Sequence, residues 1–209
     1  MAEVRTVRQE RAIKTRETIL TAAAVTFDRL GYELTTISDI LAEAALTKGA
    51  LYFHFPSKEA LAQAVMTEQV NLVTVPQSGL HMQSLIDLTF DVSHKLQTNP
   101  LMRAGIRLTI EQGTWKETNA DPYRAWVDLI EELLTRAEQD GELLPGVDTQ
   151  QAAQFVVGAF TGVQLLSQVL THRTDLDQRL TAFWDFTLPG MVNPGLMRRL
   201  RTQVAESAK

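Results

Sequence analysis

The sequence predicts an all-α protein in which a three-helix helix-turn-helix domain precedes a larger helical domain. Apolar residues recur at spacings of three and four along nearly the whole chain, and no segment sustains the period-two alternation of a strand. Near the N-terminus, two short amphipathic segments separated by a three-residue break follow one longer segment, as in a helix-turn-helix unit. We place the domain boundary after residue 57, so that the two domains span residues 1–57 and 58–209.

Local signals mark the first two helices. A buried stripe predicts a helix over residues 14–30, with Gly31 in the position of a left-handed C-terminal cap. The stripe consists of Ile19, Leu20, Ala23, Ala24, Phe27 and Leu30. Thr36 followed three residues later by Asp39 forms a capping box, which predicts that a second helix begins there and spans residues 37–44.

Beyond the helix-turn-helix, a new helix is expected to begin at Lys58, with Glu59 in its first turn, where a carboxylate suits the helix dipole. Apolar periodicity then predicts six further helices, over residues 85–96, 101–112, 123–140, 149–172, 176–188 and 194–208. The last of these is basic. We expect residues 113–122 to form a loop.

Composition excludes several classes of protein. The 209 residues include no cysteine, which excludes a disulfide framework, a thiolate zinc site and a cysteine nucleophile. The longest apolar stretch, Phe155 to Leu170, contains polar residues and is shorter than the ~20 residues of a membrane-spanning helix. The N-terminus lacks the apolar run of a secretory signal. We therefore expect a cytoplasmic protein with no membrane partner.

Charge is distributed unevenly along the chain. The net charge is −5, yet residues 1–60 hold eight basic and eight acidic side chains, so the remaining residues carry the whole deficit. The first 16 residues contain five basic side chains and two acidic ones. A basic arm on an acidic body is a modest indication of DNA binding. We expect this arm, including Arg11 and Lys14, to be disordered until DNA is present and then to follow the minor groove or the backbone.

The third predicted helix, over residues 48–53, has an outward face that suits DNA. One side of this helix and of the preceding helix is expected to be buried against the first helix, through Ile37, Ile40, Leu41, Leu46 and Leu51. The residues that then face outward are Thr47, Lys48, Gly49, Tyr52 and His54. Lys48 can reach a base edge or a phosphate, and Gly49 lets the backbone approach the groove. Hydroxyl and imidazole groups at Tyr52 and His54 can donate to phosphate oxygens.

Several of these side chains also have a purely structural interpretation. Phe53 and Phe55 are expected to be core aromatic residues. Tyr52 could belong to the same core, and Lys48 could be a solvated lysine. For Tyr52, His54 and Lys48 we favour the contact with DNA.

The string from Thr35 to Phe55, followed by Lys58-Glu59, resembles the DNA-binding signature of TetR-family repressors. The match covers about residues 10–60 and rests on Thr35-Thr36-Ile37 and on Thr47-Lys48-Gly49-Ala50-Leu51-Tyr52-Phe53-His54-Phe55. The resemblance implies a homodimeric repressor that is not an enzyme. It also implies phosphate contacts by Thr36 and Lys58, a major-groove contact by Thr47, Lys48 and Gly49, and a clamp on the backbone by Tyr52 and His54.

A finer similarity connects the chain with the γ-butyrolactone receptors of antibiotic-producing actinobacteria. It is carried by Ala50 to Phe55, by Leu101 to Leu108 and by Trp126 in the helix that follows. In that branch a tryptophan at the matching position lines the ligand pocket, which makes Trp126 the leading ligand candidate. The resemblance implies release from DNA by a γ-butyrolactone or butenolide-like molecule, and control of secondary-metabolite or antibiotic genes.

A lactone with an alkyl tail requires an apolar slot closed by a few polar groups. Trp126 offers a flat wall and an indole donor, while Thr161 and Gln164 are polar residues in an otherwise apolar helix. Alternatively, Thr161 bonds back to its own helix and Gln164 meets a neighbouring chain. The full set of ligand candidates is Leu88, Trp126, Val157, Phe160, Thr161 and Gln164.

The same region is expected to form the dimer. Gly158 and Gly162 lie four residues apart on one helix and allow another helix to approach closely. By family resemblance, residues 149–190 supply a four-helix interface between two copies. A two-fold dimer sets its recognition helices roughly 34 Å apart, one turn of DNA, and predicts a palindromic operator. The helix from Lys58 onward, shared by both domains, would connect ligand and DNA binding.

Three alternatives remain open. Within regulation, the effector could be an antibiotic, a biosynthetic intermediate or another apolar compound. A small helical enzyme has little support, because the four histidines are scattered without metal-ligand spacing and no glycine-rich phosphate loop occurs, so we expect no metal and no cofactor. A simple dimerisation module would leave the outward string from Thr47 to His54 unexplained.

Overall fold

The computed structural model describes residues 2–112 and 118–203. Within these ranges the chain is helical apart from its loops and one isolated antiparallel bridge between Leu143 and Val192. The all-α prediction is therefore confirmed. The helices pack into two compact units, one formed by residues 1–72 with 99–122 and the other by residues 73–98 with 123–209.

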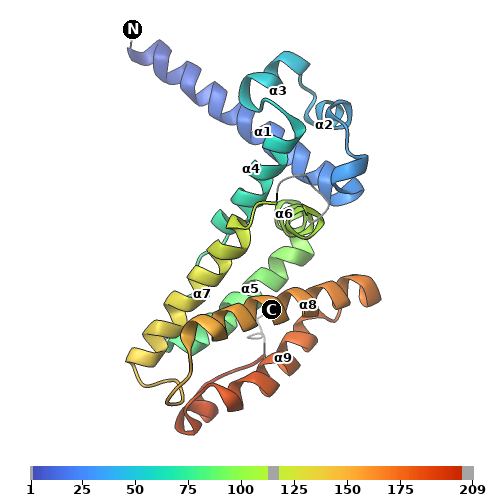
Figure 1. Ribbon diagram of the computed structural model, residues 1–209. Helices are drawn as coiled ribbons and strands as arrows, with labels where there is room; N and C mark the ends of the chain where they lie inside the picture. Colours follow the sequence, from blue (N-terminus) through green and yellow to red (C-terminus); the bar gives the residue numbers. More distant parts are fainter. Residues whose placement is uncertain (1, 113–117, 204–209) are drawn as a thin grey trace, which may run out of the picture. The chain divides into compact units, whose positions relative to one another are not determined.

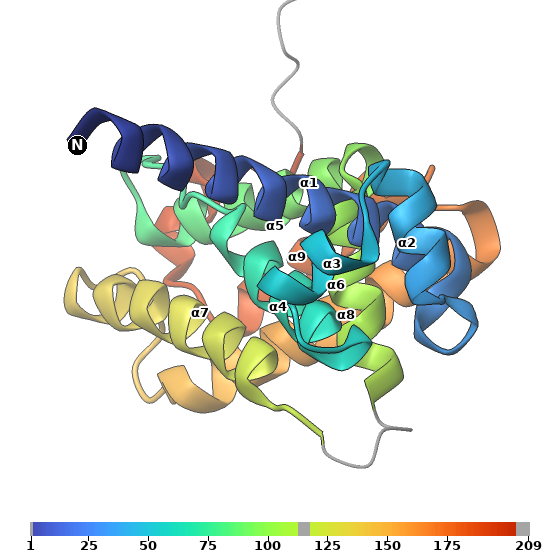
Figure 2. The ribbon, with the colours of Figure 1, turned by 90° about the horizontal axis from the view of Figure 1, so that it is seen from above.

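The first unit contains five helices: α1 (Ala2–Leu34), α2 (Ile37–Ala44), α3 (Lys48–His54), α4 (Lys58–Asn71) and α6 (Pro100–Glu111). Figures 1 and 2 show α2 and α3 beside the C-terminal half of α1. The core of this unit is built around Ile19, Phe27, Ile40, Leu51 and Leu61, with Ala104 and Leu108 of α6 packed into it. Ile37, Leu41 and Leu46 pack against that core, as their spacing predicts.

Packing therefore joins α4 and α6 to the helix-turn-helix. The boundary after residue 57 separates a predicted DNA-binding domain from a predicted ligand-binding and dimerisation domain, and this functional division stays a prediction. In the structure, α4 packs on α1, and α6 packs on both α1 and α4. The unit that contains the helix-turn-helix thus includes a helix from the middle of the chain.

The first helix differs from its predicted form in two ways. The basic arm, expected to be disordered without DNA, is helical from Ala2 onward and continuous with α1. The helix is interrupted at Gly31, as predicted, because the backbone there is non-helical, with φ of 76° and ψ of 176°, but a further helical turn continues to Leu34. The positive φ explains the glycine, because a side chain is strained in that region of backbone conformation.

The second unit contains α5 (His81–Thr98), α7 (Asp121–Gln139), α8 (Thr149–Thr171) and α9 (Leu176–Thr187), followed by the 3₁₀ turns η2 (Leu188–Gly190) and η3 (Pro194–Arg199). The bounds of these α-helices agree with the sequence pattern to within four residues. Trp184 of α9 is fully buried, and its indole N–H donates to Thr89 Oγ1 of α5 at 2.9 Å. This bond satisfies the polar atom of the largest core side chain.

The predicted final helix over 194–208 is wrong within the described residues. Only the six-residue turn η3 forms, and residues 200–203 continue as an irregular segment. Gln83 of α5 holds this segment, since its side-chain amide accepts from Arg201 N at 2.8 Å and donates to Arg201 O at 3.1 Å. Residues 204–208 of that prediction, and residues 113–117 of the predicted loop, lie outside the described residues.

Helix α8 is longer than the apolar stretch in the sequence suggests. It spans 23 residues, and its most apolar 18-residue window has a mean hydropathy of 1.4, so its length and composition alone would allow it to cross a membrane. Only 28% of that window is buried within the chain. Its exposed large apolar side chains are Phe155, Leu165, Leu166, Val169 and Leu170. An apolar face of this size, left uncovered by the part of the chain that the structure describes, indicates a site of association.

Candidate DNA-binding surface and ligand residues

The surface of α3 is built from its N-terminal cap. Thr47 lies in extended conformation before the helix, and its hydroxyl oxygen accepts from Ala50 N at 3.3 Å. This cap fixes where α3 begins and leaves Thr47, Lys48 and Gly49 exposed at its first turn. Leu51 is fully buried beneath them, so the orientation of the helix is set by its core side.

Gly49 is open on its outer side. A Cβ atom built at this position would meet no atom of residues 2–112 or 118–203 within 4 Å. Its backbone is helical, with no positive φ that would require glycine. The fold therefore gives no reason for a glycine here, whereas close approach of another molecule to the backbone would.

Three side chains follow at the C-terminal half of α3. Tyr52 is 42% exposed, and the Lys48 ammonium lies 5.8 Å from the centre of its ring. His54 is half-buried and meets Phe53 edge-on, with ring centroids 5.0 Å apart. Lysine, tyrosine and histidine donors thus lie along one short helix.

The prediction that Phe53 is a core residue is wrong. Its side chain is 80% exposed, because the helical turn that buries Leu51 and Phe55 directs Phe53 outward. Phe55 is 3% exposed, as expected for a core aromatic residue. Phe53 is therefore a candidate contact residue that the sequence reading missed. Its neighbours Tyr52 and His54 were the available signal.

Thr36 caps α2 in the predicted capping box. Its hydroxyl accepts from Asp39 N at 3.2 Å and donates to Asp39 Oδ2 at 2.7 Å, while its backbone N–H donates to the same carboxylate oxygen. These side-chain and backbone bonds lower the pKa of Asp39. The threonine is exposed at the helix start, where the helix dipole attracts an anion.

Lys58 has a role that its sequence position did not suggest. Its ammonium donates to Tyr32 O at 2.9 Å and to Thr35 O at 3.0 Å, and it lies 4.2 Å from the centre of the Tyr32 ring. Two of its three donors therefore hold the chain between α1 and α2. The phosphate contact expected for Lys58 stays a prediction.

Basic side chains of α1 extend the exposed surface. Arg11 and Lys14 are both exposed, and the guanidinium of Arg16 lies 5.1 Å from the centre of the Phe55 ring. The arm is thus a helical row of cations that reaches the helix-turn-helix through Arg16.

The ligand candidates all lie in the second unit. Leu88 is buried, and Trp126, Val157 and Phe160 are half-buried. Thr161 donates to Val157 O at 2.8 Å, which is the bond back to its own helix that we considered as the alternative to ligand binding. Gln164 is buried, and its carbonyl oxygen accepts from Arg173 at 3.2 Å. Within the chain, both polar candidates therefore have a partner.

The short helix α3 is capped at its start, faces outward on one side and packs on α1, which carries basic side chains toward it. This arrangement defines a helix-turn-helix regulator. Two family models match the chain: the TetR family of bacterial regulatory proteins over residues 19–65, and a tetracycline-repressor-like C-terminal domain over residues 79–193. The chain belongs to the TetR family.

Individual relatives support the same assignment. The A-factor receptor protein of Streptomyces griseus is 40% identical over 94% of this chain and 70% of its own length. The solved structure of TylP, a TetR regulator of Streptomyces fradiae, is 43% identical with a TM-score of 0.85, covering 92% of this chain and 93% of TylP. A solved γ-butyrolactone receptor, described as an ArpA-like protein, is 32% identical with a TM-score of 0.71, covering 90% and 94%.

Proposed function

We propose that this protein is a homodimeric repressor that binds a palindromic operator and is released by a γ-butyrolactone or butenolide-like signalling molecule. It would act in the cytoplasm, without enzymatic activity, on secondary-metabolite or antibiotic genes. The exposed face of α3 is the observation that carries DNA binding, because it combines an open Gly49 with cationic and hydroxyl donors on a core-anchored helix. The receptors similar to this chain support the ligand class.

In this proposal each exposed group has a distinct role on DNA. Thr47, Lys48 and Gly49 face the major groove, where the absent side chain of Gly49 lets the backbone approach the bases. Tyr52 and His54 donate to phosphates, as does Lys58 with its third N–H, while Thr36 does so after exchanging its hydroxyl bond to Asp39. Phe53 has no polar group and supplies apolar contact with a deoxyribose or a thymine methyl group. Arg11 and Lys14 follow the backbone.

The exposed face of α8 supports the dimer. Its large apolar side chains flank Gly158 and Gly162, which are exposed and have nothing within 4 Å of a Cβ built at either position. Phe186 of α9 is also exposed and lies on the neighbouring helix. Packing of this face on its two-fold mate would remove apolar surface from water and set the two recognition helices one DNA turn apart.

Ligand and DNA would act through linkage. A lactone that binds better to the conformation that does not match the operator weakens DNA binding, and DNA weakens the lactone by the same factor. Trp126 is the leading residue for the pocket, with Leu88, Val157 and Phe160 as apolar walls. Thr161 and Gln164 would have to exchange their internal bonds for a ligand carbonyl.

A binding selection tests the proposal. The purified protein is used to enrich duplexes from a random-sequence pool, and gel shifts on the selected duplex are repeated with a synthetic γ-butyrolactone carrying a hydrocarbon side chain. A palindromic duplex that is released by the lactone is the expected result. Release only by an antibiotic or a biosynthetic intermediate would support the second candidate effector class instead. Failure to enrich any duplex would contradict DNA binding itself.

Replacing Gly49 by alanine should raise the stability of the fold and lower the affinity for DNA. The fold should become more stable by about 0.5–1 kcal/mol, since alanine is favoured over glycine in a helix with open space around it. Affinity for the selected duplex should fall on the order of tenfold, about 1.4 kcal/mol, because the methyl group holds the backbone off the groove. Urea unfolding and fluorescence anisotropy measure the two effects. An unchanged affinity would remove Gly49 from the DNA surface.

Trp126→Ala should leave operator affinity within about twofold of wild type and reduce lactone-induced release by at least about tenfold, because only the pocket loses its wall. Trp126→Phe is the control, since it keeps an aromatic wall without the indole donor and should retain most of the release. The measurement is a lactone titration of the preformed complex. Equal loss of DNA binding and release in Trp126→Ala would show that Trp126 is a core residue.

A further inference from the structure

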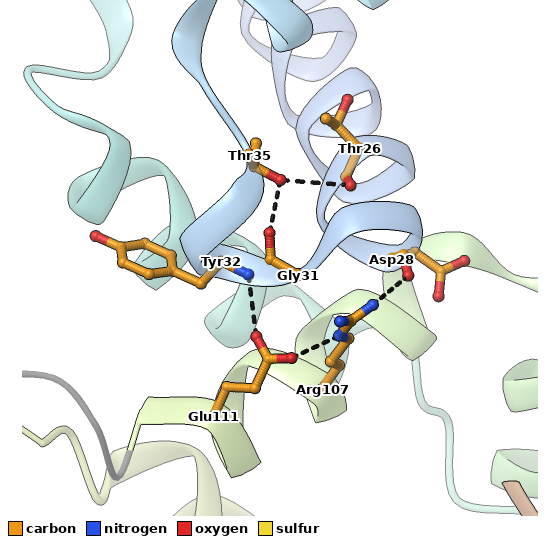
Figure 3. A network of polar contacts seen from close by, with 7 residues as sticks. All are labelled: Thr26, Asp28, Gly31, Tyr32, Thr35, Arg107 and Glu111. Carbon is orange, nitrogen blue, oxygen red and sulfur yellow. Dashed lines mark hydrogen bonds and ion pairs between the residues drawn. The ribbon is translucent and has the colours of Figure 1, made fainter. Parts of the chain in front are cut away.

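A network of charged groups on α6 holds the end of α1 (Figure 3). Glu111 accepts from the backbone N–H of Tyr32 at 3.0 Å, and Arg107 donates to the carbonyl oxygen of Asp28 at 2.8 Å. The two side chains also pair with each other, with Arg107 Nε 2.6 Å from Glu111 Oε1. One turn earlier, Arg103 Nε lies 2.7 Å from Asp28 Oδ2. Two side chains of α6 thus hold main-chain groups of α1 on both sides of its kink.

The other side of this chain segment is held as well. The Thr35 hydroxyl donates to Gly31 O at 2.6 Å, and Lys58 of α4 donates to the carbonyl oxygens of Tyr32 and Thr35. Thr36, the cap of α2, is the next residue. Residues 31–35 are the last turn of α1 together with Thr35, and we call them the α1–α2 connection. They therefore contact both α6 and the start of α4, with α2 directly attached.

The kink brings the backbone of α1 close to the same two side chains of α6. A Cβ atom built on Gly31 would lie 2.5 Å from Arg107 Nη2 and 3.1 Å from Glu111 Oε1. The backbone at Gly31 therefore lies so close to the ends of the Arg107 and Glu111 side chains that a residue with a Cβ atom would require them to shift. A displacement of α6 is therefore either absorbed by these two long side chains, transmitted to the connection, or accompanied by loss of the hydrogen bonds to it.

We propose that Arg107 and Glu111 are positioning residues for DNA binding, which hold the α1–α2 connection so that Thr36 and α2 keep the geometry that fits the operator. The inference rests on the proposed DNA binding and adds a structural connection between α6 and the DNA-binding helices. This path runs from α6 through the main chain of residues 31–35 to the cap of α2, in parallel with the direct packing of α6 on α4.

The proposal predicts a change in DNA affinity that is opposite in sign to the change expected from charge alone. Removing the Glu111 carboxylate makes the protein less negative, and an anion lost near DNA ordinarily strengthens binding. If Glu111 positions the connection, its removal weakens binding instead. Glu132 offers a control, because it pairs with Arg136 on α7 at 2.5 Å across the same spacing of four residues, in the reverse order, and both side chains are more than half exposed.

The test uses the full-length protein and the palindromic duplex that wild type selects from a random pool. Glu111→Ala should lower affinity for this duplex about tenfold, because without the bond to Tyr32 only about a tenth of the free protein would hold the conformation that fits the operator. Glu111→Gln, which can still accept from Tyr32, should lose about two- to threefold. Arg107→Lys should resemble Glu111→Ala, since an ammonium cannot reproduce the two directed donors of the guanidinium. Glu132→Ala should bind as wild type does.

Two further measurements separate positioning from other roles. The slope of log affinity against log salt concentration should be unchanged in Glu111→Ala, because no phosphate contact is lost. Amide exchange at Tyr32 should become faster. If Glu111→Ala unfolds, the affinities of Glu111→Gln and Arg107→Lys, measured under conditions in which each variant is folded, test the proposal. Folded variants with faster Tyr32 exchange and unchanged or tighter DNA binding would overturn the proposal. A wild type that selects no duplex would instead contradict the proposed function.

Discussion

Leu166→Arg should convert the dimer into monomers and lower affinity for a two-half-site operator by at least about 100-fold, because tethering of a second half-site is worth roughly 10²–10⁴ in effective affinity. Leu166 is 55% exposed within one chain and lies on the apolar face of α8. An arginine would place a cation where two such faces meet, without disturbing the core of its own chain. Analytical ultracentrifugation and fluorescence anisotropy measure the two effects.

The control carries the same change in charge away from that face. Gln139 is exposed near the end of α7, and Gln139→Arg should remain dimeric with unchanged DNA affinity. A Leu166→Arg protein that is still dimeric would move the interface to another surface. A monomer that binds the full operator as tightly as wild type would contradict the two-half-site arrangement itself.

Gly105→Ala should destabilise the first unit by about 1–3 kcal/mol, the usual cost of overpacking a core. Gly105 is buried where α6 crosses α4, and a Cβ atom there would lie 2.6 Å from Gln69 Cβ. That atom is fixed by the backbone of α4 and cannot rotate away. Urea unfolding measures the loss.

Gly49→Ala is the matched comparison for Gly105→Ala. Both replace a helical glycine by alanine, but a Cβ at Gly49 has open space around it, so the same substitution should stabilise the fold there. Opposite signs at the two positions are the expected result. A stabilising effect at Gly105 would mean that α4 and α6 separate at little cost.

The close crossing also constrains polar groups. Gln69 is buried, and its side-chain N–H donates to Thr109 Oγ1 at 3.1 Å, while Thr109 donates to Gly105 O at 2.7 Å. The three residues form a short chain of hydrogen bonds between α4 and α6. Alanine at Gly105 would displace Gln69 and with it this chain, which adds to the expected loss of stability.

The helix-turn-helix could be predicted from the sequence because its signals are local. The capping box at Thr36 involves residues three apart, and the alternation of buried and outward positions in α3 follows from helix geometry. Phe53 escaped this reading because an aromatic side chain suits a core and a contact surface equally. Only the packing of Leu51 and Phe55 decides that Phe53 faces outward.

The ligand candidates are a different case. Thr161 and Gln164 attracted notice as polar residues in an apolar helix, and in the structure each has a partner within four to nine residues. The Thr161 bond is the alternative that the sequence already offered, whereas the Gln164 bond to Arg173 depends on the αL turn after α8, which the apolar pattern does not encode. Their part in ligand binding therefore stays a proposal, together with that of Trp126.

By itself the sequence determined the all-α class, the helix-turn-helix and most helix bounds, because these depend on caps and periodicities within a few residues. The tertiary structure alone decided that α6 belongs with α1 and α4, and that Arg107 and Glu111 hold the main chain at Tyr32 and Asp28. These contacts join residues 79 positions apart. Ordinary charged residues at i,i+4 spacing give no sign of such a partner, since that pattern is equally typical of a solvated helix face.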